Sequence, residues 1–210
     1  MKRIFDIDSP IYRFMSTLLN VFLLNLCWLL GSIPIVTIGV STVAAFDVGL
    51  KMVDNEEGYI FRQYWKAYKS NLKQGIPLGL ITLAAVYAIY LDFQIVHAST
   101  NPSIILIIVG ILSMAVAVAG LLYAYPLTAR YENTLPNIIR NSFRISTKYF
   151  IRTFLLVIAL VVETVAFLWN LTMEFIGLIV GPACIILTVC LVAKPIFKKI
   201  EKENGEENDI

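Results

Sequence analysis

Long apolar runs are the feature that most constrains the fold of this chain. Residues 153–193 carry only two charged side chains, Glu163 and Glu174, and the runs 76–98 and 103–127 together carry one, Asp92. A membrane-spanning helix needs about 20 mostly apolar residues, so each shorter run supplies one span and the long run supplies two. With 58% apolar and 15% charged residues, the chain has more apolar surface than a soluble domain buries.

We therefore predict an all-α fold, a polytopic membrane helix bundle, in a single membrane domain over residues 1–200. The segment 34–53 is long enough to cross the membrane but contains Asp47, Lys51, a proline and two glycines. There are six spans if it crosses and five if it does not, and a segment that crosses only halfway or lies in the membrane plane stays open. The expected spans lie at about 12–33, 36–53, 76–98, 103–127, 150–170 and 174–193. Residues 201–210 are expected to form an acidic flexible tail.

The basic residues favour six spans. Lys and Arg concentrate on the cytoplasmic side of a membrane, close to span ends. All 17 basic residues fall in four blocks, and none lies at 74–129 or 153–193. Six spans place all four blocks, and both termini, on the cytoplasmic side, whereas five would leave the N-terminal block outside.

Two segments between the spans are predicted to be cytoplasmic amphipathic helices, at about 60–73 and 138–149. On a helix, their apolar and basic residues form two neighbouring stripes, which is typical of a helix lying in the membrane–water interface. The candidate contact residues are Phe61, Arg62, Trp65, Lys66, Tyr68, Lys69 and Lys73 in the first helix, and Ile139, Arg140, Phe143, Arg144 and Lys148 in the second.

The second amphipathic segment repeats the first after a shift of 78 residues. This shift carries Phe61 to Ile139 and Asp92 to Asn170. Both units would enter the cytoplasmic side from a span and return into the next span. The pattern predicts a parallel repeat, related by an axis along the membrane normal.

Three kinds of partner are considered for the basic stripes. Anionic lipid head groups are the baseline, because each basic residue near the surface adds about 1 kcal/mol of attraction. A partner protein that docks on the two helices is the more specific hypothesis, since two matched helices would present a paired surface. Nucleic acid is not expected, because the stripes lie beside span ends and no binding motif accompanies them. The sequence leaves self-association open.

Three carboxylates, Asp47, Asp92 and Glu163, lie inside expected spans, where a charge usually has a partner or a function. Asp47 has Lys51 one helical turn away, which predicts a local pair. Glu163 is either a proton or substrate site, or a hydrogen-bonded carboxyl that locks helix packing. A stand-alone transporter lined by Glu163 and Asp92 is the alternative function. The spacings Gly75–Gly79 and Gly177–Gly181 permit close approach of helices.

No catalytic signature occurs. The phosphate-binding GxxxxGK[ST] loop, HExxH and GxSxG are absent. The three cysteines, Cys27, Cys184 and Cys190, lie in apolar runs, and the single histidine, His97, cannot form a metal cluster alone. We expect a protein that is not an enzyme and has no catalytic residue, metal or cofactor.

Several motifs carry a resemblance to a known family. They are Asn25-Leu-Cys-Trp28, Ser32-Ile-Pro34-Ile-Val-Thr37-Ile-Gly39, Tyr64-Trp65-Lys66-Ala-Tyr68-Lys69 and Tyr125-Pro126-Leu127-Thr128-Ala-Arg130-Tyr131. In these stretches the chain resembles the YesL-like family of bacterial membrane proteins, a domain of unknown function. The resemblance implies a multi-pass protein of the bacterial cytoplasmic membrane. It also implies an accessory role beside the permease subunits of a carbohydrate ABC importer, since family members resemble products of gene clusters for such importers.

Overall fold

The computed structural model describes residues 10–56, 58–98 and 103–208, and within these ranges every regular element is helical. A 3₁₀-helix, η1 (Ile35–Thr37), joins the first two α-helices. The α-helices are α1 (Pro10–Ser32), α2 (Ile38–Val53), α3 (Ile60–Ser70), α4 (Leu72–Ala98), α5 (Ile104–Leu121), α6 (Ala124–Arg130), α7 (Leu135–Lys148), α8 (Phe150–Phe167) and α9 (Leu171–Asn208).

Six helical segments are long and apolar enough to cross a membrane, which confirms the predicted fold class. The doubtful segment is among them, and it is more buried inside the protein than any other. This burial explains its composition, because irregular or polar backbone at membrane depth is tolerated where protein covers it. The six segments are Phe14–Ser32, Ile35–Val53, Leu72–Ala98, Ile104–Arg130, Phe150–Phe167 and Leu171–Glu203.

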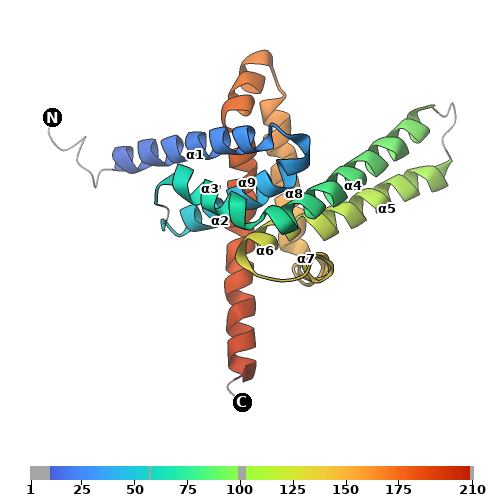
Figure 1. Ribbon diagram of the computed structural model, residues 1–210. Coiled ribbons are helices and arrows are strands. Elements are labelled where there is room, and N and C mark those ends of the chain that lie inside the picture. Colours follow the sequence, from blue (N-terminus) through green and yellow to red (C-terminus); the bar gives the residue numbers. More distant parts are fainter. Residues whose placement is uncertain (1–9, 57, 99–102, 209–210) are drawn as a thin grey trace.

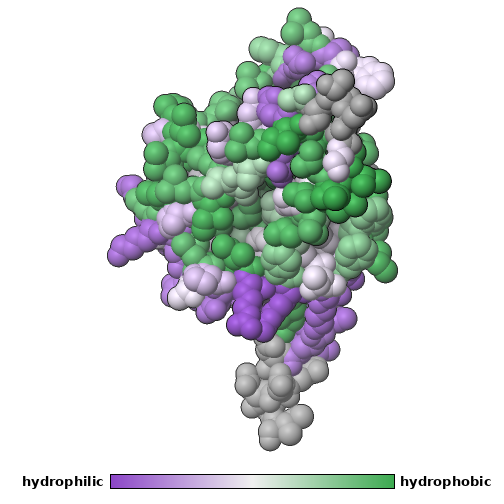
Figure 2. Space-filling model, turned by 90° about the vertical axis from the view of Figure 1, so that its right-hand side faces the viewer, coloured by the Kyte–Doolittle hydropathy of each residue, from purple (hydrophilic) through white to green (hydrophobic). Residues whose placement is uncertain are grey.

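The spans form three hairpins, joined by the two amphipathic helices. The first hairpin is α1–α2, the second is α4 with α5 and α6, and the third is α8–α9; α3 and α7 connect them. Figure 1 shows α4–α5 projecting to the upper right and the α8–α9 hairpin to the top, so their outer ends diverge. Figure 2 shows hydrophobic residues over most of one side, with hydrophilic residues gathered at its lower end and in a smaller group near its top. This distribution is that of a multi-pass membrane protein.

Helix α2 occupies the centre of the molecule and packs against α1, α3, α4, α6 and α9. It crosses α4 backbone to backbone. A Cβ atom on Gly39 would lie 2.2 Å from the carbonyl oxygen of Gly75 and 2.5 Å from the Cα of Gly79. Only glycine fits at such a crossing, so the Gly75–Gly79 spacing permits the expected close approach. In the third hairpin, Gly177 similarly faces the ring of Phe167.

A buried asparagine ties α1 to α9. Pro182 lies inside α9 and has no N–H to donate to the carbonyl of Leu178. The side-chain amide of Asn25, which is fully buried, donates to the Leu178 oxygen at 2.9 Å and to the Ile179 oxygen at 2.7 Å. Its own oxygen accepts from the backbone N–H of Ala183 at 3.2 Å. Asn25 therefore satisfies the backbone groups that the proline leaves exposed.

Two predicted boundaries differ from the structure by four residues or more. Helix α9 does not stop near residue 193, and its residues 201–208 are helical rather than a separate acidic tail. The reason is that Glu201 and Glu203 pair with basic residues of neighbouring elements. Helix α4 begins at Leu72 instead of residue 76, so Lys73 belongs to α4 and not to the amphipathic helix α3. The placement of both termini on the cytoplasmic side stays a prediction.

Candidate docking surface

Helix α3 is fixed by an inner row of three buried residues, Ile60, Tyr64 and Ala67. The Tyr64 hydroxyl lies 2.7 Å from the Ser41 hydroxyl, which donates to the carbonyl of Trp28. Burial raises the pKa of Tyr64, so it stays a neutral donor. The inner row therefore holds α3 against the α1–α2 hairpin.

Tyr68 and Thr37 satisfy the backbone at the break after α1. Both hydroxyls donate to the carbonyl of Gly31, at 3.3 Å and 2.9 Å. A helix that ends within the membrane leaves such carbonyls without intrahelical partners. Helix α3 thus covers the irregular turn between the first two spans.

Helix α7 does the same for the break between α5 and α6. Its inner row contains Ile138, Ser142 and Ile145. The Ser142 hydroxyl donates to the carbonyl of Ala119 at 3.1 Å and accepts from the N–H of Tyr123 at 3.3 Å. These are backbone groups at the interruption where α5 ends and α6 begins.

The inner rows support the predicted repeat. The shift of 78 residues carries the inner row of α3 onto the inner row of α7, residue by residue. It also carries Ser41, the partner of Tyr64, onto Ala119, the partner of Ser142. Both amphipathic helices therefore use equivalent positions to pack against the helix break that precedes them in the chain.

The outward side of α3 is exposed and open. Its five residues, here called the α3 outer row, surround a surface hollow of about 660 Å³. Trp65 packs edge-on against both Tyr64 and Tyr68, with ring centroids 5.4 Å and 5.1 Å away, whereas the Phe61 side chain is 62% exposed. The α3 outer row is Phe61, Arg62, Trp65, Lys66 and Lys69.

The sequence did not reveal which residues of α3 face inward. The predicted contact residues lie beside the inner row, where Phe61 is exposed and Trp65 and Tyr68 are half-buried. In α7, Ile139 and Phe143 are half-buried and lie beside Gly120 of α5. These two side chains therefore serve packing within the chain. The inner row of α3 was missed because aromatic residues lie both in it and beside it.

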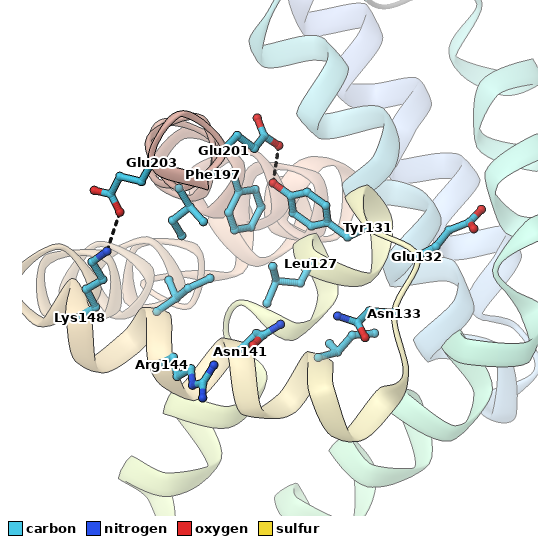
Figure 3. Close-up of a pocket in the computed structure, with 13 residues that line it drawn as sticks. Leu127, Tyr131, Glu132, Asn133, Asn141, Arg144, Lys148, Phe197, Glu201 and Glu203 are labelled. Atoms are coloured by element: carbon cyan, nitrogen blue, oxygen red, sulfur yellow. Dashed lines mark hydrogen bonds and ion pairs between the residues drawn. The ribbon is translucent and has the colours of Figure 1, made fainter. Parts of the chain in front are cut away.

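Arg144 and Lys148 of α7 border a second cavity, of about 510 Å³, between α7 and α9 (Figure 3). Leu127, Ile145 and Phe197 form part of its apolar wall. Lys148 is bonded to Glu203 of α9 at 2.7 Å. The exposed side chains of Arg140 and Arg144 form no ion pair within the described residues.

The C-terminal part of α9 is held by ion pairs. The sequence did not reveal these pairs. The Arg130 guanidinium bonds both oxygens of Glu201, at 2.9 Å and 3.0 Å, and the Tyr131 hydroxyl donates to the same carboxylate. The buried Lys194 bonds the carbonyl of Leu50 and pairs with Asp54 at 2.5 Å. The hydrogen bond from Lys194 lowers the pKa of Asp54. Position along the chain gave no signal for these pairs, since their partners are about 70 to 140 residues apart.

The three carboxylates singled out in the sequence, Asp47, Asp92 and Glu163, each bond a residue of the same hairpin. Asp47 pairs with Lys51 at 2.6 Å, as predicted. Asp92 of α4 accepts from the Ser113 hydroxyl of α5 at 2.5 Å. Glu163 of α8 accepts from the Thr188 hydroxyl of α9 at 3.1 Å. The structure therefore places Asp92 and Glu163 in separate hairpins, whose outer ends diverge in Figure 1, and gives each a packing partner.

Comparison with known proteins gives one family. The model described as "Protein of unknown function, DUF624" matches residues 21–93. These residues, here called the DUF624 segment, are similar to that family. The match confirms the resemblance to a YesL-like membrane protein that the motifs indicated. No curated protein and no solved structure matches the chain.

The DUF624 segment contains the parts of the fold that position the α3 outer row. It runs from the middle of α1, through α2 and α3, to near the end of α4. It therefore includes the glycine crossing of α2 with α4, and the tyrosines that fix α3. Among the described residues, no group of three or more His, Cys, Asp or Glu side chains could hold a metal ion.

Proposed function

We propose that this protein is a non-enzymatic accessory subunit of a carbohydrate ABC importer in the bacterial cytoplasmic membrane. It docks on the importer's permease subunits through the α3 outer row, at the cytoplasmic edge of the membrane. The family resemblance supports the choice of partner. The geometry of α3 supports the docking role.

The observation that carries the proposal is the contrast between the two sides of α3. Three inner residues are buried, and one of them, Tyr64, is hydrogen-bonded to the first hairpin, while Phe61 projects with 62% of its surface exposed, beside Arg62 and Lys69. A fixed helix that presents aromatic side chains beside an Arg resembles the centre of a protein interface, where aromatic residues and Arg are enriched.

Retention of the partner tests this proposal. The tagged protein is purified in mild detergent from its host grown on plant polysaccharide, and co-purifying proteins are quantified by mass spectrometry. The variant Phe61→Ser/Arg62→Glu should retain at least tenfold less permease than the wild type. Lys199→Glu makes the same change of charge on exposed α9 and should retain as much as the wild type.

Equal retention of permease by all three proteins would refute docking through α3. Wild-type protein that purifies without any permease would refute the importer assignment. The stand-alone transporter hypothesis would then be tested by solute flux in liposomes, with Glu163→Gln as the diagnostic variant. No observation on the described residues favours it now, because Glu163 and Asp92 contribute to different hairpins.

A further inference from the structure

Three span ends converge on one hollow of about 620 Å³ between α2, α3, α4 and α6. Lys51 stands near the end of the second span, Lys73 near the start of the third, and Arg130 at the end of the fourth. Lys66 of α3 completes the ring of cations. Since the ends of spans mark the border of the hydrocarbon core, the hollow lies at the depth of lipid phosphates.

Part of this charge is already compensated. Lys51 pairs with Asp47 at 2.6 Å, and Arg130 pairs with Glu201, which lies outside the hollow. Lys66 and Lys73 have no ion-pair partner in the part of the chain that the structure describes. Glu132, the second carboxylate of the lining, is also unpaired there. Two lysine ammonium groups therefore remain available for an anion.

The hollow also contains an acceptor that lacks a donor. The side-chain oxygen of Gln63 is buried and has no hydrogen-bond partner. A buried carbonyl is costly to leave unpaired. The amide groups of Asn71 and Gln74 line the same hollow but already donate to the carbonyls of Ala67 and Asn133. If the Gln63 amide turns so that its oxygen faces the hollow, a hydroxyl-bearing ligand can supply the missing donor.

We propose that this hollow binds a hydroxyl-bearing phosphate, of the glycerol phosphate type, between Lys66 and Lys73. The phosphate accepts from the two ammonium groups, which are strong point-charge donors to phosphate. A hydroxyl of the ligand donates to the oxygen of Gln63. The group is either the head group of an anionic phospholipid or the same group free in solution. This site goes beyond the proposed docking role, because it requires no partner protein.

Lipid binding by the purified, full-length protein tests the site. Native mass spectrometry measures the affinity for phosphatidylglycerol and for phosphatidylcholine. The wild type should prefer phosphatidylglycerol, and Lys66→Gln/Lys73→Gln should weaken its binding at least tenfold. The matched control, Arg62→Gln/Lys69→Gln, removes the same charge from α3 residues outside this hollow and should leave the affinity within about twofold.

The hydroxyl contact has its own variant. Gln63→Leu should weaken the binding of phosphatidylglycerol but not that of phosphatidic acid, which has no head-group hydroxyl beyond the phosphate. Soluble glycerol phosphate, added to the lipid-stripped protein, distinguishes the two sources. Binding of the soluble compound with the same loss in Lys66→Gln/Lys73→Gln identifies a free ligand, and binding of the lipid alone identifies a head-group site.

Two results would overturn the proposal. One is an equal loss of affinity in the two double variants, which would show a general effect of surface charge. The other is equal binding of phosphatidylcholine and phosphatidylglycerol by the wild type. Each variant is first checked for a monodisperse elution profile. If the double variant does not fold, Lys73→Gln alone is compared with Lys69→Gln, since both lysines are exposed.

Discussion

At the scale of single residues, Asn25 has the clearest structural role. It lies in the first span and bonds three backbone groups around Pro182 in the last span. Asn25→Leu would leave buried carbonyls without donors, and each such group costs about 1–3 kcal/mol. We expect a loss of about 2 kcal/mol, read as a lower melting temperature of the protein in detergent.

Proline removal provides the control for this prediction. In Asn25→Leu/Pro182→Ala, the new N–H at position 182 can donate to Leu178 within α9, so part of the lost stability should return. Pro182→Ala alone tests whether the proline itself limits stability. If the double variant is no more stable than Asn25→Leu, the amide does not act by replacing the missing helix bond.

The resemblance motifs gain a physical explanation at the same scale. Trp28 donates to Thr42 at 3.1 Å and accepts from Ser41 through its carbonyl. Tyr64 and Tyr68, in the third motif, bond Ser41 and Gly31. These residues close the break between the first two spans and hold α3. The first three motifs therefore meet in one folding unit, in which Trp28, Tyr64 and Tyr68 have structural roles.

At the scale of elements, Asp54 connects α2 to α9 through Lys194 at 2.5 Å and Lys198 at 3.2 Å. Its pKa is lowered by these bonds, Lys194 first. A carboxyl whose pKa is lower in the folded state stabilises the fold above its unfolded pKa of about 3.9, and this contribution is lost as the pH falls through the folded value.

Melting temperatures of wild type and Asp54→Asn should therefore differ by a few degrees at pH 7. The difference should shrink as the pH is lowered below about 4, where the wild-type carboxyl begins to take up a proton. Lys198→Ala is the control, because that ammonium is 59% exposed and exposed pairs contribute little. A difference that is constant from pH 7 to pH 3 would contradict the role of the Asp54 charge.

Elements differed in how well the sequence predicted them. The spans and both amphipathic helices were predicted because length and apolar composition determine them locally. The pair of Asp47 with Lys51 was predicted because a helix brings residues that are four positions apart close together. The inner row of α3 was missed, since which side of an aromatic-rich helix faces inward depends on Ser41 and Gly31 of another hairpin. The helical continuation of α9 was missed because its acidic residues pair with Arg130 and Lys148.

At the scale of the whole molecule, the repeat and the hairpins are parts of one arrangement. Each amphipathic helix hydrogen-bonds the helix break that precedes it and leads directly into the next span. The second and third hairpins leave the centre in different directions (Figure 1), and most of their large apolar side chains are exposed. Carboxylate–hydroxyl bonds hold each of these hairpins together from within. Stability at the periphery is therefore local to each hairpin, while α2 unites the centre.

The hairpin arrangement predicts the orientation of the whole chain. The turns of the second and third hairpins should face the outside, and α3 and the end of α9 should face the cytoplasm, as the distribution of basic residues requires. Single variants report this through labelling by a membrane-impermeant maleimide in intact cells. Ser103→Cys, at an exposed position in the second turn, should react directly. Lys69→Cys and Lys199→Cys should react only after permeabilisation.

Ile33 decides the number of spans, because it stands just before the doubtful segment. We expect Ile33→Cys and Lys69→Cys to be labelled from the same side, because the Tyr68 hydroxyl lies 3.3 Å from the carbonyl of Gly31 and a hydrocarbon core of about 30 Å cannot separate positions so close together. The wild-type protein is the background control, since Cys27 and Cys190 are buried and Cys184 is half-buried. Labelling of the two positions from opposite sides would contradict the contact between α3 and the first turn, and would show that residues 34–53 cross the membrane completely.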